Sequence, residues 1–315
     1  MKSVTEQTLA QPQAHRVGLL PYLALVFGIV GLAMTPMFVR WAHTPGPVAG
    51  LYRVAIAALL LALPAARQAQ RQSRQPAGIS RRHLLLAVLA GLFFAGDLAT
   101  WNTSVLITNA ANATLLGNTA PVWVSLGALV LFKEKLGKVF WAGLVLAMAG
   151  AVVILGGDFL AHPEVGLGDL LAVIAGFFYG SFLLTTQRAR SGLSSLLSWW
   201  VAACASAAAL LAICLVLGQP IVGYPALAYV SLIAAALISQ VWGYLSLNYA
   251  LGHLSASVVS PTLLLQPVLT ALLAVPLLGE GISWEQALGG GVVLMGIWII
   301  HRSSADARQA ETAEA

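Results

Sequence analysis

The sequence is short of charge: Asp, Glu, Lys and Arg together make up only 9% of its 315 residues, whereas apolar side chains make up 59%. A soluble domain has about 25% charged and about 45–50% apolar residues. One soluble core of this length could not hide so much apolar surface. The composition therefore excludes an ordinary soluble protein and indicates a chain whose apolar side chains face lipid.

Cysteines and metal-ligand patterns are also scarce. The only cysteines, Cys204 and Cys214, share one apolar run, where helical spacing would hold them about 15 Å apart, too far for a disulfide. The six histidines are scattered without metal-ligand spacing, and no HExxH, GxSxG or phosphate-loop motif occurs. We therefore expect no metal, no cofactor and no enzymatic activity.

What the sequence has in abundance is long apolar runs, and a membrane-spanning helix needs about 17–25 such residues. The expected fold is an all-α membrane protein with ten transmembrane helices, over residues 17–39, 46–64, 83–105, 111–132, 138–156, 167–187, 195–217, 225–249, 255–278 and 284–301. The first run is too long for the core of a signal peptide. Residues 1–16 form a polar N-terminal tail, and residues 302–315 form a polar C-terminal tail that we expect to be disordered.

The basic residues fall mainly on one side of this ten-span arrangement. That side receives both termini and the loops that contain Arg67 to Arg82, Lys133 to Lys138, and Arg188 with Arg190. The other side carries mainly acidic residues: Asp158, Glu164, Asp169, Glu280 and Glu285. The positive-inside rule then predicts cytoplasmic termini and a multi-pass protein of the bacterial inner membrane. The net charge of +5 arises from these loops and indicates membrane orientation. It does not indicate nucleic-acid binding, because the sequence has no stripe of alternating aromatic and basic residues.

The chain also repeats itself. A shift of 146 residues superimposes five pairs of like residues, namely Asn102 on Asn248, Pro121 on Pro267, Glu134 on Glu280, Gly143 on Gly289 and Gly150 on Gly296. The two repeats are residues 17–157 and 158–301, each with five spans. Since five is odd, the second repeat would enter the membrane from the opposite face and give an inverted repeat, an arrangement suited to alternating access with a site at the midplane.

Two stretches carry a resemblance to a known family. APVWVSLGALVLFKEKLG is echoed by QPVLTALLAVPLLGEGIS, and GLFFAGDLATWNTSVLITNAANATLLGNTAPVW precedes the first of them. Together with Arg53, these stretches resemble the EamA family of the drug/metabolite transporter superfamily over nearly all of residues 17–301. The resemblance implies an exporter of small metabolites, with the amino-acid exporters of the YddG type as the most similar kind.

Charges inside a membrane are costly and must face a partner or a cavity. Asp97 and Arg53 are predicted at similar depth. Asp97 could bind a substrate ammonium group or a proton, or it could instead form a structural bond to Arg53 or to a hydroxyl group. The second repeat has no carboxylate equivalent to Asp97, so we expect an asymmetric site for a ligand with one polar and one apolar end.

Polar and aromatic side chains inside the spans complete the predicted substrate site. Gln240, Tyr244 and Asn248 recur every four residues, which predicts a cavity-facing stripe on one helix. The remaining substrate-binding candidates are Trp101, Asn118, Tyr179 and Gln266. The alternative is that the amides hold helices together and the aromatic rings sit at the membrane interface.

Structural or gating roles are predicted for a second set of residues. Pro121 and Pro267 lie inside spans, where proline kinks a helix. Glu134 and Glu280 lie at helix ends, where they would bond loop amides or cap the next helix.

The pattern predicts a secondary transporter that exports small metabolites, foremost amino acids, by alternating access. The expected partners are that small-molecule substrate and the lipid bilayer, without nucleic acid, and a monomer is expected. The alternatives are an exporter of nucleobases, drugs or polyamines, an intramembrane enzyme acting on lipid, and a receptor that transports nothing.

Overall fold

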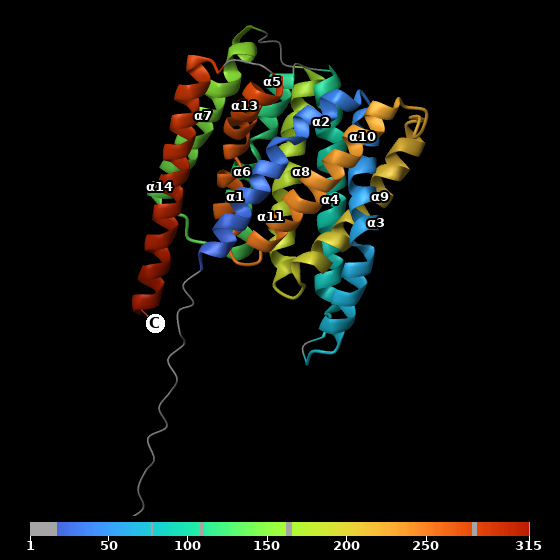
Figure 1. Cartoon of the computed structure of the whole chain (residues 1–315). Helices are drawn as coiled ribbons and strands as arrows, with labels where there is room; N and C mark the ends of the chain where they lie inside the picture. The colour runs from blue at the N-terminus through green and yellow to red at the C-terminus, as the bar shows by residue number, and fades with distance from the viewer. Residues whose placement is uncertain (1–17, 77, 108–109, 162–165, 279–281, 315) are drawn as a thin grey trace, which may run out of the picture.

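The computed structural model describes residues 18–76, 78–107, 110–161, 166–278 and 282–314, and every regular element in these ranges is helical (Figure 1). In chain order the elements are α1 (Leu19–Ala33), α2 (Thr35–Ala42), α3 (Gly46–Ser73), α4 (Arg81–Ile107), α5 (Ala110–Gly117), α6 (Ala120–Gly127), the π-helical η1 (Ala128–Phe132), α7 (Lys138–Ala161), α8 (Leu167–Arg190), α9 (Ser195–Val216), α10 (Ala226–Ala235), the π-helical η2 (Ala236–Gly243), α11 (Tyr244–Ala250), α12 (Ala256–Thr262), α13 (Leu265–Leu278) and α14 (Trp284–Glu314).

Within the described residues, eight helical stretches are long and apolar enough to cross a membrane. They coincide with eight of the ten predicted spans. The other two predicted spans correspond to α7, whose described apolar part is the 17 residues Lys138–Ile154, and to α14. A multi-pass membrane protein is thus established, while the count of ten remains a prediction.

Three of the apolar stretches are each divided into two helices. α2 and α6 each begin with a proline in the first two positions, Pro36 and Pro121, and Pro267 lies in the first turn of α13. Proline lacks the backbone N–H that a continuous helix needs and clashes with the preceding turn, so the chain restarts there. The short segments that join α1 to α2, α5 to α6, and α12 to α13 therefore present polar backbone and side-chain groups.

Two helices run past the ends that the sequence predicts. α3 continues to Ser73 rather than ending at 64, and α14 continues to Glu314, so the prediction of a disordered tail from 302 is wrong for the described residues. Both extensions are rich in Ala, Gln and Arg, which are strong helix formers even without apolar partners.

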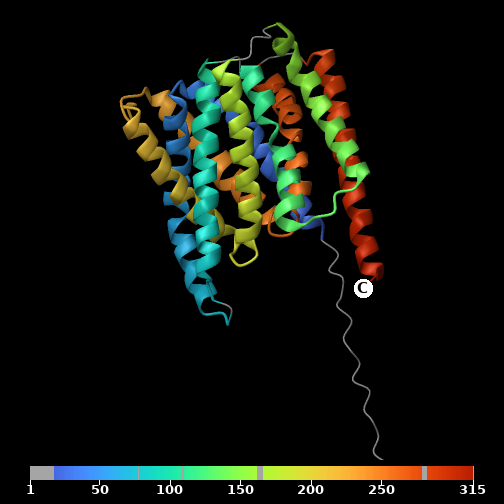
Figure 2. The same ribbon diagram turned by 180° about the vertical axis from the view of Figure 1, so that it is seen from behind.

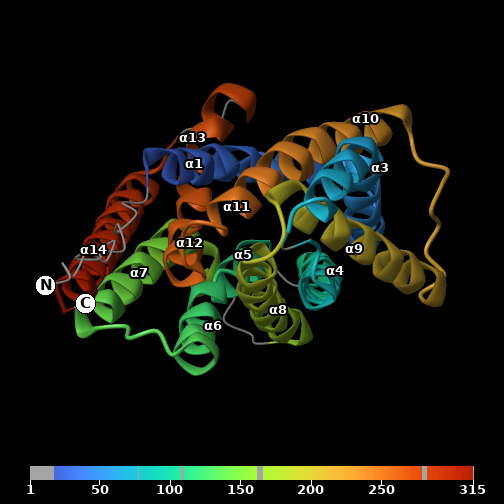
Figure 3. The same cartoon turned by 90° about the horizontal axis from the view of Figure 1, so that it is seen from below.

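The helices of the first repeat pack on helices of the second. α4 lies along α8, α3 along α9, α7 along α14, and α1 against α11 and η2 (Figures 1 and 2). Viewed from the end where the C-terminus lies, α7 and α14 form one side of the bundle and α3, α4 and α9 the other (Figure 3). The largest buried cluster lies between the repeats and includes Phe94, Phe182, Trp199 and Tyr244.

α7 and α14 meet through glycines. A Cβ on Gly150 would lie 2.7 Å from the carbonyl oxygen of Gly289, and one on Gly143 would lie 3.0 Å from that of Gly296. Because no side chain intervenes, the two backbones approach closely, as small residues allow in membrane helix pairs. Residue numbers rise along one helix as they fall along the other, so the two helices are antiparallel.

One end of the bundle gathers the basic helix ends. The end of α3, the turn after α8 and the C-terminus all lie at the lower end in Figure 1. Arg71, Arg188, Arg190 and Arg302 belong to these segments. The loops that the sequence groups on one side of the membrane therefore do share one end of the molecule.

Candidate functional site

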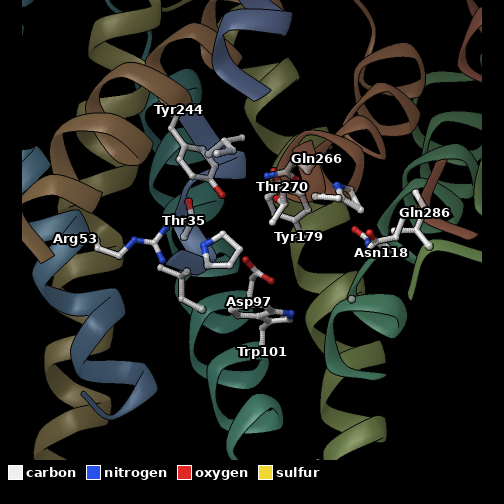
Figure 4. Close-up of a pocket in the computed structure, with 17 residues that line it drawn as sticks. Thr35, Arg53, Asp97, Trp101, Asn118, Tyr179, Tyr244, Gln266, Thr270 and Gln286 are labelled. Atoms are coloured by element: carbon white, nitrogen blue, oxygen red, sulfur yellow. The ribbon is translucent and has the colours of Figure 1, made fainter. Parts of the chain in front are cut away.

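A cavity of about 360 Å³ lies between the two repeats. Its walls come from helices of both repeats (Figure 4). Six of the eight predicted substrate-binding residues line it, and so do two residues predicted to be structural or gating. These eight residues are Asp97, Trp101, Asn118, Tyr179, Tyr244 and Gln266, together with Arg53 and Pro267.

The helix breaks bring polar groups to this cavity. Thr35 begins α2, Asn118 lies between α5 and α6, and Gln266 lies in the first turn of α13. Thr35 donates a hydrogen bond to Ser239 of η2 (2.8 Å), which ties α2 to the second repeat. The side-chain amide nitrogen of Asn118 is buried and has no hydrogen-bond partner.

Arg53 is a buried cation at the cavity wall, with 3% of its surface exposed. The side-chain oxygen of Gln240 in η2 accepts two hydrogen bonds from it, 2.6 Å from Nη2 and 3.1 Å from Nε, in the amide orientation that its neighbours require. The backbone carbonyl of Gln240 in turn accepts a hydrogen bond from Trp199 Nε1 (2.8 Å). The charge is therefore held from the second repeat.

Asp97 faces the same cavity from α4 (Figure 4). It attracts Arg53 electrostatically, but among the described residues no ion pair within 4.0 Å joins the two, and the Asp97 carboxylate accepts no hydrogen bond. One carboxylate and one guanidinium group are thus both presented to the cavity without neutralising each other by direct contact.

Aromatic rings form the wall between these charges and the core. The Tyr244 ring stacks on Trp199 (centroids 4.9 Å apart, planes at 15°) and meets Phe94 edge-on at 4.7 Å. Tyr179 stacks on Phe182 at 5.9 Å. Both Tyr179 and Tyr244 line the cavity. Such a wall offers apolar surface with a polar tip.

Comparison with known proteins identifies the family of this chain. The sequence profile of the EamA-like transporter family matches residues 19–156 and again residues 166–302. The chain belongs to the EamA-like transporter family. The two matches correspond to the two repeats, and membership makes this a membrane transporter of small molecules, from a family of transporters rather than enzymes.

Two further comparisons were with solved structures and with curated proteins. A crystal structure of a protein superimposes with a TM-score of 0.74 at 18% identity, over 89% of this chain and 96% of the other. At that identity it supports the fold of this EamA-family chain and nothing more. No curated protein matches the sequence.

Two of the predicted binding residues lie elsewhere in this EamA-family transporter. Gln240 and Asn248 are fully buried outside the cavity, so of the three residues in the predicted stripe only Tyr244 reaches it. Gln240 lies behind Arg53: its side-chain oxygen accepts both hydrogen bonds from the guanidinium group, which itself lines the cavity. Asn248 donates to the carbonyl of Tyr244 (3.2 Å) within its own helix.

The residues predicted to be structural have varied surroundings. Pro121 is buried at the start of α6. Glu134 is predicted to bond a loop amide or cap the next helix; within the described part of the chain its carboxylate instead accepts a hydrogen bond from the hydroxyl of Ser257 in α12, in the other repeat. Glu280 lies outside the described residues, so its predicted role stays a prediction.

The cavity also includes residues that the sequence analysis missed. Thr35, Thr270 and Gln286 line it, and Trp199 supports it from behind. Gln286 had a detectable signal: the spacing Ser283–x–x–Gln286 is that of a helix capping box. Trp199 had none, because its role depends on contacts with α4 and α11 that only the tertiary fold creates.

Proposed function

We propose that this chain is a secondary transporter that exports zwitterionic metabolites, foremost amino acids, across the bacterial inner membrane by alternating access. The observation that carries the proposal is the pair of opposite charges, Asp97 and Arg53, that face one cavity without direct contact. Unpaired charges inside a membrane protein are expensive. A ligand with both an ammonium and a carboxylate group would satisfy both charges at once.

The cavity walls support a ligand with an apolar portion as well. Trp101, Tyr179 and Tyr244 supply aromatic surface beside the charges. This composition argues against two of the other small-molecule classes. A polyamine would meet the repulsion of Arg53, and an uncharged nucleobase would leave both charges unsatisfied.

The glycine contacts between α7 and α14 support an inverted repeat. The 146-residue shift makes Gly143 equivalent to Gly289, and Gly150 to Gly296. The observed pairs are Gly143 with Gly296, and Gly150 with Gly289. The counterparts of the two glycines in one pair are therefore the two glycines of the other pair, which is the reciprocity that a two-fold axis across the helices imposes. Such an axis lies in the membrane plane. If the two repeats exchange their conformations, the site opens to the other side of the membrane, as alternating access requires.

The helix pairs follow the same rule. α4 on α8 joins the third predicted span to the sixth, and α1 on η2 and α11 joins the first to the eighth. In the proposed repeat, the third span is equivalent to the eighth, and the first to the sixth. The two-fold axis therefore relates the α4–α8 pair to the pair of α1 with η2 and α11. We therefore propose one cavity that each repeat can expose in turn.

The basic end of the bundle supports an orientation with cytoplasmic termini. Hydrogen bonds join the repeats at this end, among them those from the Ser257 hydroxyl to the Glu134 carboxylate and from Arg188 to the carbonyl of Leu131. α2 and the first turn of α14, which contribute to the cavity, lie toward the opposite end (Figure 1). The structure thus fits a state closed toward the cytoplasm.

The test is transport by the purified protein in proteoliposomes loaded with a labelled amino acid. External competitors would be leucine, its decarboxylated amine and its deaminated acid, which share one side chain and differ only in the charged groups. We expect leucine to compete and the two singly charged analogues to compete at least about tenfold more weakly, since each leaves one buried charge unpaired. Absence of flux for every amino acid from a well-folded preparation would overturn the proposal.

A further inference from the structure

The cavity has a second polar end that the charge pair does not use. In Figure 4, Asn118 and Gln286 lie across the cavity from Arg53 and Asp97, with Tyr179 between the two sets. Among the residues that the structure describes, the lining of this second end includes no cation and no carboxylate. Its chemistry is therefore that of neutral amides.

The orientation of the Gln286 amide is determined by a helix cap. Its side-chain oxygen accepts a hydrogen bond from the backbone N–H of Ser283 (3.0 Å), while the Ser283 hydroxyl accepts one from the backbone N–H of Gln286 (3.2 Å). This reciprocal pair is a capping box at the start of α14. Because the oxygen is engaged, the NH₂ group of Gln286 is the part left for a ligand, and it has no partner among the described residues.

Asn118 contributes the second donor. It lies in the break between α5 and α6, and its side-chain NH₂ is buried without a hydrogen-bond partner. Buried polar groups in native proteins are nearly always paired, and an exception calls for an explanation. Both Asn118 and Gln286 line the cavity, so an acceptor carried by a ligand is the partner that their unpaired donors lack.

We propose that Asn118 and Gln286 form a subsite for an uncharged oxygen acceptor at the far end of the substrate, such as a side-chain carboxamide. This rests on the proposed function, in which Arg53 and Asp97 bind the α-carboxylate and α-ammonium groups. The preferred substrates are then neutral polar amino acids of the glutamine kind. A second carboxylate, as in glutamate, would be buried here without a cation and is disfavoured.

The experiment compares three ligands of similar length, glutamine, norleucine and glutamate, as competitors of transport and as stabilisers of the purified protein against heat. We expect glutamine to bind at least about tenfold more tightly than norleucine, because an apolar chain leaves the two donors unpaired. Glutamate should bind more weakly than glutamine.

Two variants isolate the subsite. Asn118→Leu removes one donor, and Gln286→Glu keeps the acceptor that caps Ser283 while replacing the donor by oxygen. In each we expect the preference for glutamine over norleucine to fall by at least about threefold. The preference compares two ligands on one preparation, so a smaller folded fraction does not alter it.

The outcomes separate the two proposals. Equal binding of glutamine and norleucine by the wild-type protein, or tighter binding of glutamate, would overturn the subsite and leave amino-acid transport intact. Binding of none of the three ligands, nor of leucine, would overturn the proposed function itself. Because the ligand series is run on the wild-type protein, the subsite stays testable even where a variant fails to fold.

Discussion

Gln240 of the second repeat accepts two hydrogen bonds from Arg53 of the first, and its own backbone carbonyl is held by Trp199. The cation at the cavity wall is thus positioned by a residue that does not itself line the cavity. Since the bond joins α3 to η2, any relative movement of the two repeats must also move Arg53 or break its contacts. The charge that would bind substrate is in this way coupled to the interface that would move during transport.

Two replacements of Gln240 distinguish what its contact with Arg53 contributes to folding stability from what it contributes to substrate binding. Gln240→Leu should lower the free energy of unfolding by about 1.5–3 kcal/mol, because a hydrogen bond to a charged group is worth that much and the cation stays buried. Gln240→Glu should fold as well as wild type but transport at least about tenfold less, since the new carboxylate occupies Arg53 in place of the substrate. Thermal unfolding and proteoliposome flux measure the two effects. Wild-type transport by Gln240→Glu would argue against substrate binding at Arg53.

Arg53 itself can be tested by a change of specificity. Lysine keeps the charge but cannot match the two-point contact with Gln240, so Arg53→Lys should reduce flux by about tenfold or more. Arg53→Met removes the charge, and the variant should no longer distinguish an amino acid from its decarboxylated amine. The readout is competition by the two ligands relative to each other, which a general folding defect would not alter. A retained preference for the amino acid would assign carboxylate recognition to another residue.

Asp97 has the complementary role. Asp97→Asn keeps the shape of the side chain and removes the charge, so flux of zwitterionic substrates should fall by about tenfold or more. Wild-type flux should decline at acidic pH as the carboxylate takes up a proton, whereas the remaining flux of Asp97→Asn should lack that dependence. Flux measured in proteoliposomes across a pH series tests both statements. Unchanged transport with an unchanged pH profile would remove Asp97 from the mechanism.

Much of the fold follows from local patterns in the sequence. Eight of the ten predicted spans coincide with stretches that are apolar and long enough to cross a membrane, because span length and hydropathy are properties of each segment alone. The breaks at Pro36, Pro121 and Pro267 likewise follow from the chemistry of single residues. The extensions of α3 and α14 were missed because membrane thickness was taken to end each helix.

The site was only partly predictable for a different reason. Charged, amide and aromatic residues within apolar runs indicated six cavity-lining residues, since polar groups inside a membrane need a polar environment. Gln240 does not line the cavity because it bonds Arg53 from behind, and this contact between α3 and η2 exists only in the tertiary fold. Trp199 takes part through contacts with elements far apart in the chain, which a single sequence does not report.

The glycine contact between α7 and α14 predicts a sharp contrast between neighbouring positions. A Cβ at Gly150 would lie 2.6 Å from the backbone nitrogen of Val293, whereas one at Gly291, on the same partner helix, has open space around it. Gly150→Ala should therefore cost about 1–3 kcal/mol of stability through overpacking. Gly291→Ala is the matched control and should be neutral or stabilise by up to about 1 kcal/mol. Equal unfolding temperatures for the two variants would contradict the close packing of α7 on α14.

The hydrogen bond between Glu134 and Ser257 should hold the basic end of the bundle closed. It joins the end of η1 to the start of α12 across the two repeats, so Ser257→Ala should favour opening at this end. Spin labels at Lys135 and His253, both in exposed linkers there, would report the change as a larger population of long distances. Cys204 and Cys214 would first be replaced by serine so that only the introduced cysteines carry labels.

Ser231→Ala is the control for this opening experiment, because the Ser231 hydroxyl bonds only to the carbonyl of Leu227 within its own helix. Its distance distribution should match that of the unmodified background. If Ser257→Ala also matches the background, the Glu134–Ser257 bond does not hold the repeats together. If Ser257→Ala opens this end, flux should rise when opening toward the cytoplasm is the rate-limiting step of transport. Flux should stay constant when substrate release is rate-limiting. Measuring distances and flux on the same variant thus identifies which step of alternating access this bond controls.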